Sequence, residues 1–283
     1  MINLDGIIQR INEFPTLPTI YSNLMDVMVN PRSTAMDVAN VVSKDQASAS
    51  KVLKAANSSI YGFQGRVTNI SQAVMFLGFE EIKNLITALS IIDLFASIKT
   101  KNAINPVNLW KHSIAVGTLA RSIGKTIGVK EIENYFLAGI LHDLGKLLFY
   151  KIIPESYSKV MNYSIENRIT HREAELKIIG TNHLVAGEIL AEKWKLPPAI
   201  RNVIRYHSTG TVNGKTDELV SCVHIANITA NMFGFGSKGD ETIQEPNKSV
   251  WKDLDLPNNY FTSNIAKFQA EYEESVKLLL KNK

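Results

Sequence analysis

The residues of this sequence whose types suit chemistry are six histidines and one His-Asp pair. Four of the histidines lie on apolar stripes of expected helices, namely His112, His142, His183 and His207. A single buried histidine is ordinarily explained by a hydrogen bond, but repeated burial of imidazole is costly unless every ring finds a partner. Because His and Asp suit Fe, Mn, Ni or Zn as ligands, a shared metal ion would satisfy these histidines together, and the sequence predicts a metal site.

Asp143 stands between His142 and Lys146 in the segment Leu-His-Asp-Leu-Gly-Lys (141–146), which follows an apolar helix. Its carboxylate can bind the metal, or it can pair with Lys146 three residues further on. A buried carboxylate without either partner would be strongly destabilising. The sequence leaves both alternatives open and predicts that at least one of them is real.

The other two histidines are not predicted to bind metal. His171 follows Thr170, and Glu173 three positions after that threonine indicates a capping box at a helix start. This pattern places the His171 ring at the surface. His224 lies about 100° around its helix from Val223, off the main apolar stripe.

The elements that must position these residues are predicted to be helices. Apolar residues between positions 82 and 96 recur at i, i+3 and i+4. All nine prolines fall between such periodic segments, where they do not break a helix. Because long alternating strand patterns are scarce, we expect an all-α multi-helix bundle of about a dozen helices.

A polar segment at residues 97–106 ends in a proline and marks a predicted domain boundary. Residues 1–97 then form an N-terminal helical subdomain, and residues 98–283 form a helical core. Residues 234–257 are rich in Gly, Asp, Asn and Pro, which predicts a long surface loop. A last amphipathic helix is expected over residues 261–280.

Composition excludes several classes of protein. The 283 residues are 45% apolar and 20% charged, as in ordinary globular chains, so disorder or coiled coil along the whole chain is excluded. The 31 basic residues exceed the 27 acidic ones by only four, without a dense basic run, so no nucleic-acid partner is expected. A single cysteine cannot form an internal disulfide, and we find no signal-peptide or membrane-spanning pattern. We expect a cytoplasmic protein without membrane contact.

Two stretches of the sequence resemble a known family. The first contains Phe-Pro-Thr-Leu-Pro (14–18), then Lys-Val-Leu-Lys-Ala-Ala-Asn-Ser-Ser-Ile-Tyr-Gly (51–62), then Ile-Ser-Gln-Ala-Val (70–74). The second stretch runs from His112 to residue 231. Together they resemble the HDOD domain family, a signalling branch of the HD superfamily of metal-dependent phosphohydrolases. The resemblance covers most of residues 6–235 and implies an HD-domain-like bundle with an additional N-terminal helical subdomain.

The resemblance also implies the roles of single residues. His112 corresponds to the first histidine of HD enzymes, and His142 and Asp143 correspond to their His-Asp pair. His183 and His207 correspond to the additional histidines of members that bind two metals. These five residues are therefore the expected metal ligands.

Three further positions bear on activity. Lys146 corresponds to a lysine that often follows the His-Asp pair and approaches the phosphate. Asn227 stands where HD enzymes carry a late Asp; it stays in the predicted ligand set as an oxygen donor, but it lacks the charge that strengthens metal binding. Relatives that cleave cyclic-di-GMP carry Gly-Tyr-Pro after the last histidine, whereas Ser-Thr-Gly-Thr (208–211) follows His207 here.

These features favour a bacterial signal-transduction module that regulates a signalling protein partner, with a partly retained metal site and little or no hydrolase activity. The alternative is a metal-dependent phosphohydrolase that acts on a nucleotide or cyclic nucleotide, with Asp143 and Lys146 as catalytic residues. In that reaction the metal lowers the pKa of the attacking water, and Lys146 offsets charge on the phosphoryl oxygens. The sequence does not predict an oligomeric state.

Overall fold

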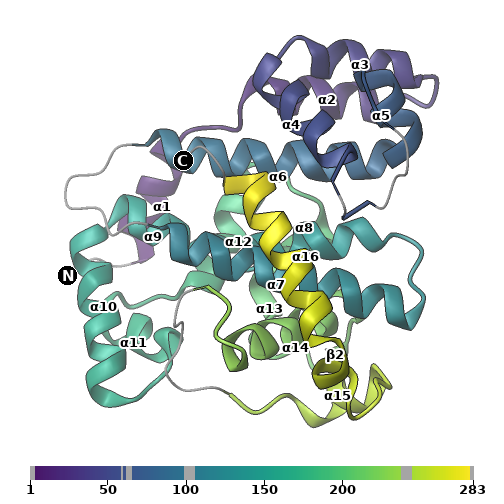
Figure 1. Cartoon of the computed structure of the whole chain (residues 1–283). Coiled ribbons are helices and arrows are strands. Elements are labelled where there is room, and N and C mark those ends of the chain that lie inside the picture. The colour runs from purple at the N-terminus through teal and green to yellow at the C-terminus, as the bar shows by residue number, and fades with distance from the viewer. Residues whose placement is uncertain (1–3, 59, 62–65, 99–105, 237–243, 281–283) are drawn as a thin grey trace. The chain divides into compact units, whose positions relative to one another are not determined.

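The computed structural model describes residues 4–58, 60–61, 66–98, 106–236 and 244–280 (Figure 1). Within these ranges the chain is almost wholly helical, and strand pairing is limited to one antiparallel hairpin of β1 (Thr211–Val212) and β2 (Lys215–Thr216). The all-α prediction is confirmed, although the helices are more numerous than the expected dozen. No helix in this described part combines the length and the apolarity needed to cross a bilayer.

The chain divides into two compact units, each built from two stretches of sequence. The larger unit comprises Met1–Pro15 and Ile98–Asn264, and the smaller comprises Thr16–Ser97 and Ile265–Lys283. The larger unit contains the hairpin and α1 (Leu4–Glu13), α7 (Val107–Ile127), α8 (Ile132–Leu141), α9 (Leu144–Ile152), α10 (Pro154–Asn167), α11 (His171–Ile178), α12 (His183–Lys193), α13 (Pro198–Tyr206), α14 (Glu218–Met232) and α15 (Lys248–Asp253). The smaller unit contains α2 (Thr19–Val29), α3 (Ala35–Ser43), α4 (Gln46–Ala56), α5 (Ile70–Leu77) and α6 (Phe79–Ser97), and α16 (Tyr260–Leu280) begins in the larger unit and ends in the smaller.

The predicted domains, 1–97 and 98–283, are continuous in sequence, whereas these units are not. The first helix belongs to the larger unit because side chains at the end of α12 hold it there. Lys193 donates hydrogen bonds to two backbone carbonyls of α1, each at 2.8 Å, and the indole N–H of Trp194 donates to the carbonyl of Pro15 at 3.0 Å. The division into domains 1–97 and 98–283 stays a prediction.

Local sequence explains where several helices begin. Thr170 and Glu173 form the predicted capping box at the start of α11. Pro154 and Pro198 are the first residues of α10 and α13, where a missing N–H leaves no intrahelical hydrogen bond unmade. The prolines therefore punctuate the helices as the sequence predicts.

The region after α14 differs from the prediction of a loop over residues 234–257. The loop prediction is wrong at α15, where Val250 is fully buried and Asn247 caps the helix. One buried apolar residue in six gives too weak a periodicity to detect in the sequence. Residues 237–243 of the predicted loop lie outside the described residues. The last helix, α16, begins one residue before its predicted start.

Glycines let the helices that carry the predicted ligands approach at backbone distance. A Cβ on Gly139 of α8 would lie 2.4 Å from the Cα of Gly117 on α7. A Cβ on Gly145 of α9 would lie 1.9 Å from the carbonyl oxygen of His183 on α12. Real side chains do not fit at such distances, because protein interiors are already close-packed. Glycine at these positions therefore allows α7 to pack on α8 and α9 to pack on α12.

The single cysteine of the sequence, Cys222, is fully buried in α14. Burial raises the pKa of its thiol, and the nearby carboxylates of Glu218 and Asp217 raise it further. The thiol is therefore protonated and shielded, which is the state in which cysteine is inert.

The substitution Gly145→Ala should destabilise the protein by about 3 kcal/mol or more, because the added methyl group meets the backbone of α12. Gly128→Ala is the control: Gly128 has a φ of +79° and open space at its Cβ position, so only backbone strain of about 1–2 kcal/mol applies. Urea denaturation followed by circular dichroism measures both losses. Equal losses in the two variants would contradict the close-packing argument.

Candidate metal centre

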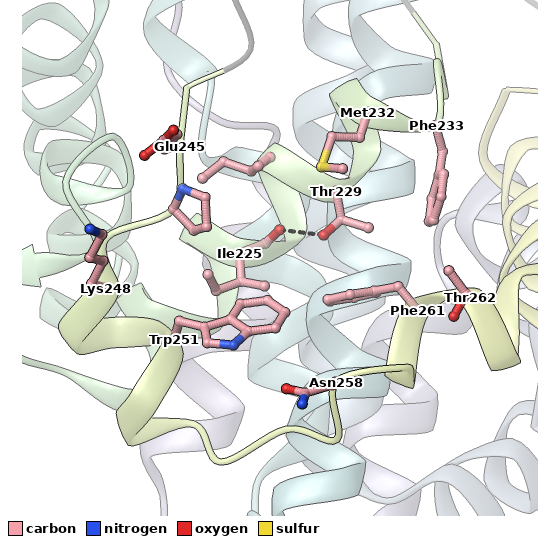
Figure 2. Close-up of a pocket in the computed structure, with 12 residues that line it drawn as sticks. Ile225, Thr229, Met232, Phe233, Glu245, Lys248, Trp251, Asn258, Phe261 and Thr262 are labelled. Carbon is pink, nitrogen blue, oxygen red and sulfur yellow. Dashed lines mark hydrogen bonds between the residues drawn. The ribbon is translucent and has the colours of Figure 1, made fainter.

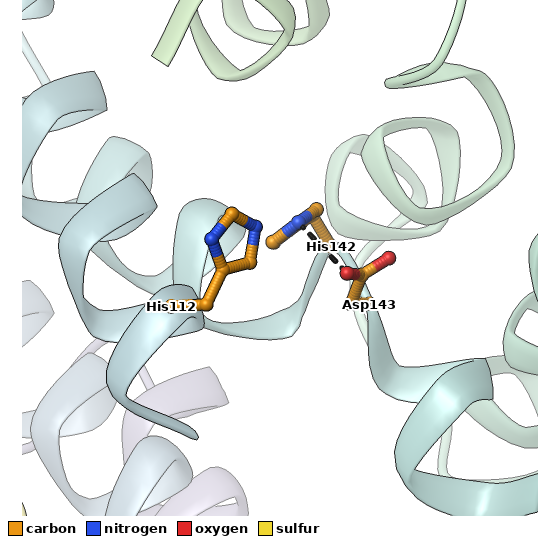
Figure 3. A group of neighbouring side chains, drawn as sticks. All are labelled: His112, His142 and Asp143. Atoms are coloured by element: carbon orange, nitrogen blue, oxygen red, sulfur yellow. Dashed lines mark ion pairs between the residues drawn. The ribbon is translucent and has the colours of Figure 1, made fainter. Parts of the chain in front are cut away.

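The structure brings five of the predicted residues into one buried cluster in the larger unit. Two groups share Asp143, and within each group the ligand atoms lie within 4.8 Å of one another. Figure 3 shows the first group, with the rings of His112 and His142 beside the Asp143 carboxylate. All five residues are nearly inaccessible, with at most 4% exposure. The first group is His112, His142 and Asp143, and the second is Asp143, His183 and His207.

Backbone carbonyls orient two of the histidine rings. The Nδ1 of His142 lies 2.7 Å from the carbonyl oxygen of Gly139, and the Nδ1 of His207 lies 3.2 Å from that of Val203. A carbonyl can only accept, so each Nδ1 carries the proton and each Nε2 keeps a free lone pair. The free Nε2 atoms face Asp143, at 3.3 Å from its Oδ2 for His142 and 3.6 Å from its Oδ1 for His207.

A carboxylate orients the third ring. Glu175, on α11, accepts hydrogen bonds on Oε2 from the backbone N–H of His183 at 2.8 Å and from its ring Nδ1 at 2.6 Å. The Nε2 of His183 consequently faces Asp143 Oδ1 at 3.6 Å. Three imidazoles thus present the same nitrogen to one carboxylate.

The surroundings of Asp143 test whether the cluster fits a cation. Both Asp143 oxygens, His142 Nε2 and His112 Nδ1 are buried without a hydrogen-bond partner among the described residues. Lys146 Nζ lies 2.9 Å from Asp143 Oδ2, so the two charges pair without hydrogen-bond geometry. Of the two predicted partners of Asp143, Lys146 is thus in contact with the carboxylate. The other partner, a metal ion, stays a prediction. Nitrogen and oxygen atoms of His and Asp that converge without hydrogen-bond partners are the set of ligand atoms that suits a transition-metal ion.

Burial and neighbouring charges hold three of the predicted ligands, Asp143, His112 and His207, in the protonation states that metal binding requires. Burial alone would raise the pKa of Asp143, but the neighbouring His142 and Lys146 outweigh it and hold this pKa well below its usual range. Burial lowers the pKa of His112 to about 4, and it also lowers the pKa of His207 well below the usual value. At neutral pH the carboxylate is ionised and these two rings are neutral, as metal binding requires.

Asn227 lies beside His112 rather than beside Asp143 in this arrangement. Its Oδ1 is 2.9 Å from His112 Nε2, and it also accepts a longer hydrogen bond of 3.4 Å from the side chain of Asn231. The first contact is a hydrogen bond when Nε2 carries the proton, which leaves Nδ1 as the free ligand atom. A separation of about 3 Å is also that of two ligands on one metal ion, given metal–ligand bonds of about 2 Å.

The two histidines that were not predicted as ligands lie outside both groups. His171 is the first residue of α11 and is partly exposed. His224 is buried: its Nδ1 donates to the carbonyl of His207 at 2.8 Å, and its Nε2 accepts from the backbone N–H of Asn247 at 3.1 Å. His224 thus ties the backbone of a predicted ligand to the residue that caps α15.

A second concave site has a different chemistry. A pocket of about 520 Å³ lies between α14, α15 and the start of α16, and Figure 2 shows Trp251, Phe261 and Met232 on its walls. The Thr229 hydroxyl on its wall donates a hydrogen bond to the backbone carbonyl of Ile225, at 2.8 Å, so its proton is not available to a ligand. The pocket is mainly apolar and contains none of the predicted ligands. We therefore assign the chemistry to the buried cluster.

Comparison with known proteins identifies the family. The family model of the HDOD domain matches residues 14–209, more than half of the chain. The chain belongs to the HDOD domain family. The match includes four of the clustered histidines and Asp143, whereas Asn227 lies beyond it.

Solved structures of other proteins are similar over most of the chain. An HDOD domain protein of unknown function from Geobacter sulfurreducens is 25% identical, with a TM-score of 0.78 over 96% of this chain and 99% of the other. A proposed phosphohydrolase from Shewanella amazonensis has the same fold, at 21% identity and a TM-score of 0.75 over 96% and 97% of the two chains.

Curated relatives are longer than this HDOD chain. An uncharacterized protein of Treponema pallidum is 27% identical over 226 residues, which are 79% of this chain and 43% of the relative. The protein YuxH of Bacillus subtilis is 26% identical over 132 residues, or 47% of this chain and 31% of YuxH. The matches thus span less than half of each relative.

Sequence reasoning missed the residues that hold the ligands in place. Glu175 lies eight positions before His183 on a different helix, so no helical period connects the two. Its only signal in the sequence is the spacing of three residues from Glu175 to Ile178, which places an acidic residue on the same helix face as an apolar one. His224 was set aside because it lies off the apolar stripe, although its ring is only 3% exposed.

The metal-free protein should lose stability as the pH falls from about 6.5 to about 4. The pKa of His112 is about 4 in the folded protein, against an ordinary value of 6.5, so the unfolded chain binds more protons in this window and is favoured. Urea denaturation with a chelator, at several pH values across the window, measures the effect. In His112→Gln the decrease should be smaller, and an identical pH profile in the two proteins would contradict this assignment.

Proposed function

We propose that this HDOD chain is a metal-binding regulatory module with little or no hydrolase activity. The observation that supports it is the convergence of four histidines on Asp143 in a cluster with at most 4% exposure. The geometry suits the binding of an ion, whereas its burial leaves almost no surface for a phosphodiester. A signalling protein is the partner that we propose, and the cytoplasm is the proposed location.

The arrangement favours two ion positions that share one carboxylate. His142 faces Oδ2 of Asp143, and His183 and His207 face Oδ1. His112 would complete the first position and Asn227 would add a neutral oxygen beside it. The ions that suit these donors are Fe, Mn, Ni or Zn. Such an ion, when bound, supplies Lewis-acid chemistry.

Asn227 is a second reason to favour a regulatory role. An amide oxygen can coordinate an ion, but it adds no negative charge, so an ion at this position is held less strongly than by a carboxylate. Asn227 Oδ1 also faces the His112 ring at 2.9 Å. Weaker ion binding and weaker polarisation of a metal-bound water would both lower hydrolase activity, so Asn227 favours the regulatory role.

A second candidate function is a phosphohydrolase acting on a nucleotide or cyclic nucleotide, and Lys146 is the residue that favours it. Its ammonium lies 2.9 Å from Asp143 and is 8% exposed as a residue. A lysine beside the ligands can offset charge on phosphoryl oxygens. In this alternative the cluster must open to admit the substrate.

Purified, untagged wild-type protein should contain about one metal equivalent or more. His142→Ala should lose most of it, because the substitution removes the Nε2 that faces Asp143. Elemental analysis by mass spectrometry measures both. His171→Ala is the matched control, since His171 lies outside the cluster, and it should keep the wild-type content. Metal-free wild-type protein that also takes up no added Mn²⁺ or Zn²⁺ would contradict the proposal.

The metal-loaded wild-type protein should hydrolyse phosphodiesters slowly or not at all. A panel of bis(p-nitrophenyl) phosphate, cyclic nucleotides and cyclic dinucleotides tests this. Asn227→Asp restores the missing charge, so it should bind metal more tightly, and any gain in hydrolysis should appear in this variant. Turnover by wild-type protein that is abolished by Lys146→Ala would favour the phosphohydrolase instead.

A further inference from the structure

We infer that Glu175 is a positioning residue of the metal centre, which holds His183 with its proton on Nδ1 so that Nε2 is free to bind metal beside Asp143. This inference rests on the proposed metal binding and goes beyond it, because it names a residue outside the ligand set that determines which nitrogen of a ligand is available.

The contacts of Glu175 carry the inference. Its Oε2 accepts both hydrogen bonds that His183 can donate on that side, from the backbone N–H at 2.8 Å and from ring Nδ1 at 2.6 Å. Its Oε1 accepts from the Tyr157 hydroxyl at 3.1 Å. Glu175 is 0% exposed and Tyr157 is 1% exposed. Three donors thus converge on a carboxylate that water hardly reaches.

The three histidines that face Asp143 differ in what holds their Nδ1. Neutral backbone carbonyls hold His142 and His207, whereas an acidic side chain holds His183. A carboxylate bonded to the far nitrogen of an imidazole fixes the ring and makes the ligand nitrogen more basic. Among these three rings, His183 is therefore the one whose ligand nitrogen depends on a side chain that a substitution can remove.

Tyr157 supports the same assignment. Burial raises the pKa of its hydroxyl well above the usual value, and Glu175 raises it further. The hydroxyl therefore stays protonated and keeps donating to Oε1. This leaves Oε2 for His183 and fixes the plane of the carboxylate, so the chain Tyr157–Glu175–His183 ends at the Nε2 that faces Asp143.

The same contacts are also consistent with a purely structural role for Glu175, and an experiment must distinguish that role from positioning of the His183 ring. Asn182 caps α12 by accepting hydrogen bonds from the backbone N–H groups of Leu184 and Val185. Glu175 accepts from the N–H of His183, the first residue of the helix, which has no acceptor within the helix. A carboxylate at a helix N-terminus is favourable in itself. If this were its whole role, removal of Glu175 would lower stability without changing the ring's tautomer.

The test compares Glu175→Ala and Glu175→Gln with wild-type protein by two measurements. The first is the tautomer of His183 in metal-free protein, from ring ¹⁵N chemical shifts, with the signal assigned by its loss in His183→Gln. The second is the dissociation constant for Co²⁺, from visible absorption. The control is Glu218→Gln, because Glu218 also accepts a hydrogen bond from a tyrosine hydroxyl, that of Tyr135 at 2.6 Å, outside the cluster.

We expect His183 to be protonated on Nδ1 in wild-type protein and in Glu218→Gln. In Glu175→Ala the tautomer should shift toward Nε2–H, the form that free histidine prefers in water, and the Co²⁺ dissociation constant should rise about 10- to 100-fold. Glu175→Gln keeps an acceptor oxygen, so it should retain the Nδ1–H form and lose affinity by a smaller factor.

Two results would overturn the inference: an unchanged tautomer in Glu175→Ala, or a Glu175→Gln variant that binds Co²⁺ as tightly as wild-type protein. The second result decides the question even if the alanine variant does not fold. Failure of wild-type protein to bind Co²⁺ would instead contradict the proposed function, while the tautomer of His183 would still report on Glu175.

Discussion

A carboxylate buried among helix ends needs opposite charge or hydrogen-bond donors close by, and the arrangement of the larger unit around Asp143 depends on this requirement. Asp143 is 1% exposed, yet its environment holds its pKa well below the ordinary value, so it is ionised at neutral pH. An isolated charge in such a place would be expelled or neutralised. Lys146 supplies part of the compensation at 2.9 Å, and the ring nitrogens of His142, His183 and His207 face the same carboxylate.

The residues around this carboxylate lie mainly at the ends of helices. His142 and Asp143 join α8 to α9, His183 opens α12, and His207 follows α13. Each of these positions is at a helix terminus, where backbone carbonyls or N–H groups are available to orient a side chain. Glycine contacts set the spacing of the helices at backbone distance, and backbone carbonyls orient His142 and His207, whereas the side chain of Glu175 orients His183.

Much of this arrangement could be predicted from the sequence, because it depends on local signals. Helical periodicity and proline placement predicted the all-α class, and the His-Asp pair with three further histidines predicted the cluster. What escaped prediction is non-local. Glu175 contacts His183 from a different helix, and α15 has too few buried residues to show a period. Asn227 was predicted as an oxygen donor, but its contact with His112 was not predicted. The discontinuity of the two units likewise depends on contacts between distant segments, such as Lys193 with α1.

The buried thiol of Cys222 leaves the folded chain without a reactive cysteine. It is the only cysteine in the sequence, and its protonated, enclosed sulfur offers oxidants and electrophiles no reactive site in the native state. Disulfide formation, glutathionylation and nitrosylation therefore have no starting point in the folded chain. In the native state, cysteine chemistry therefore offers no route by which a redox signal could act on this chain.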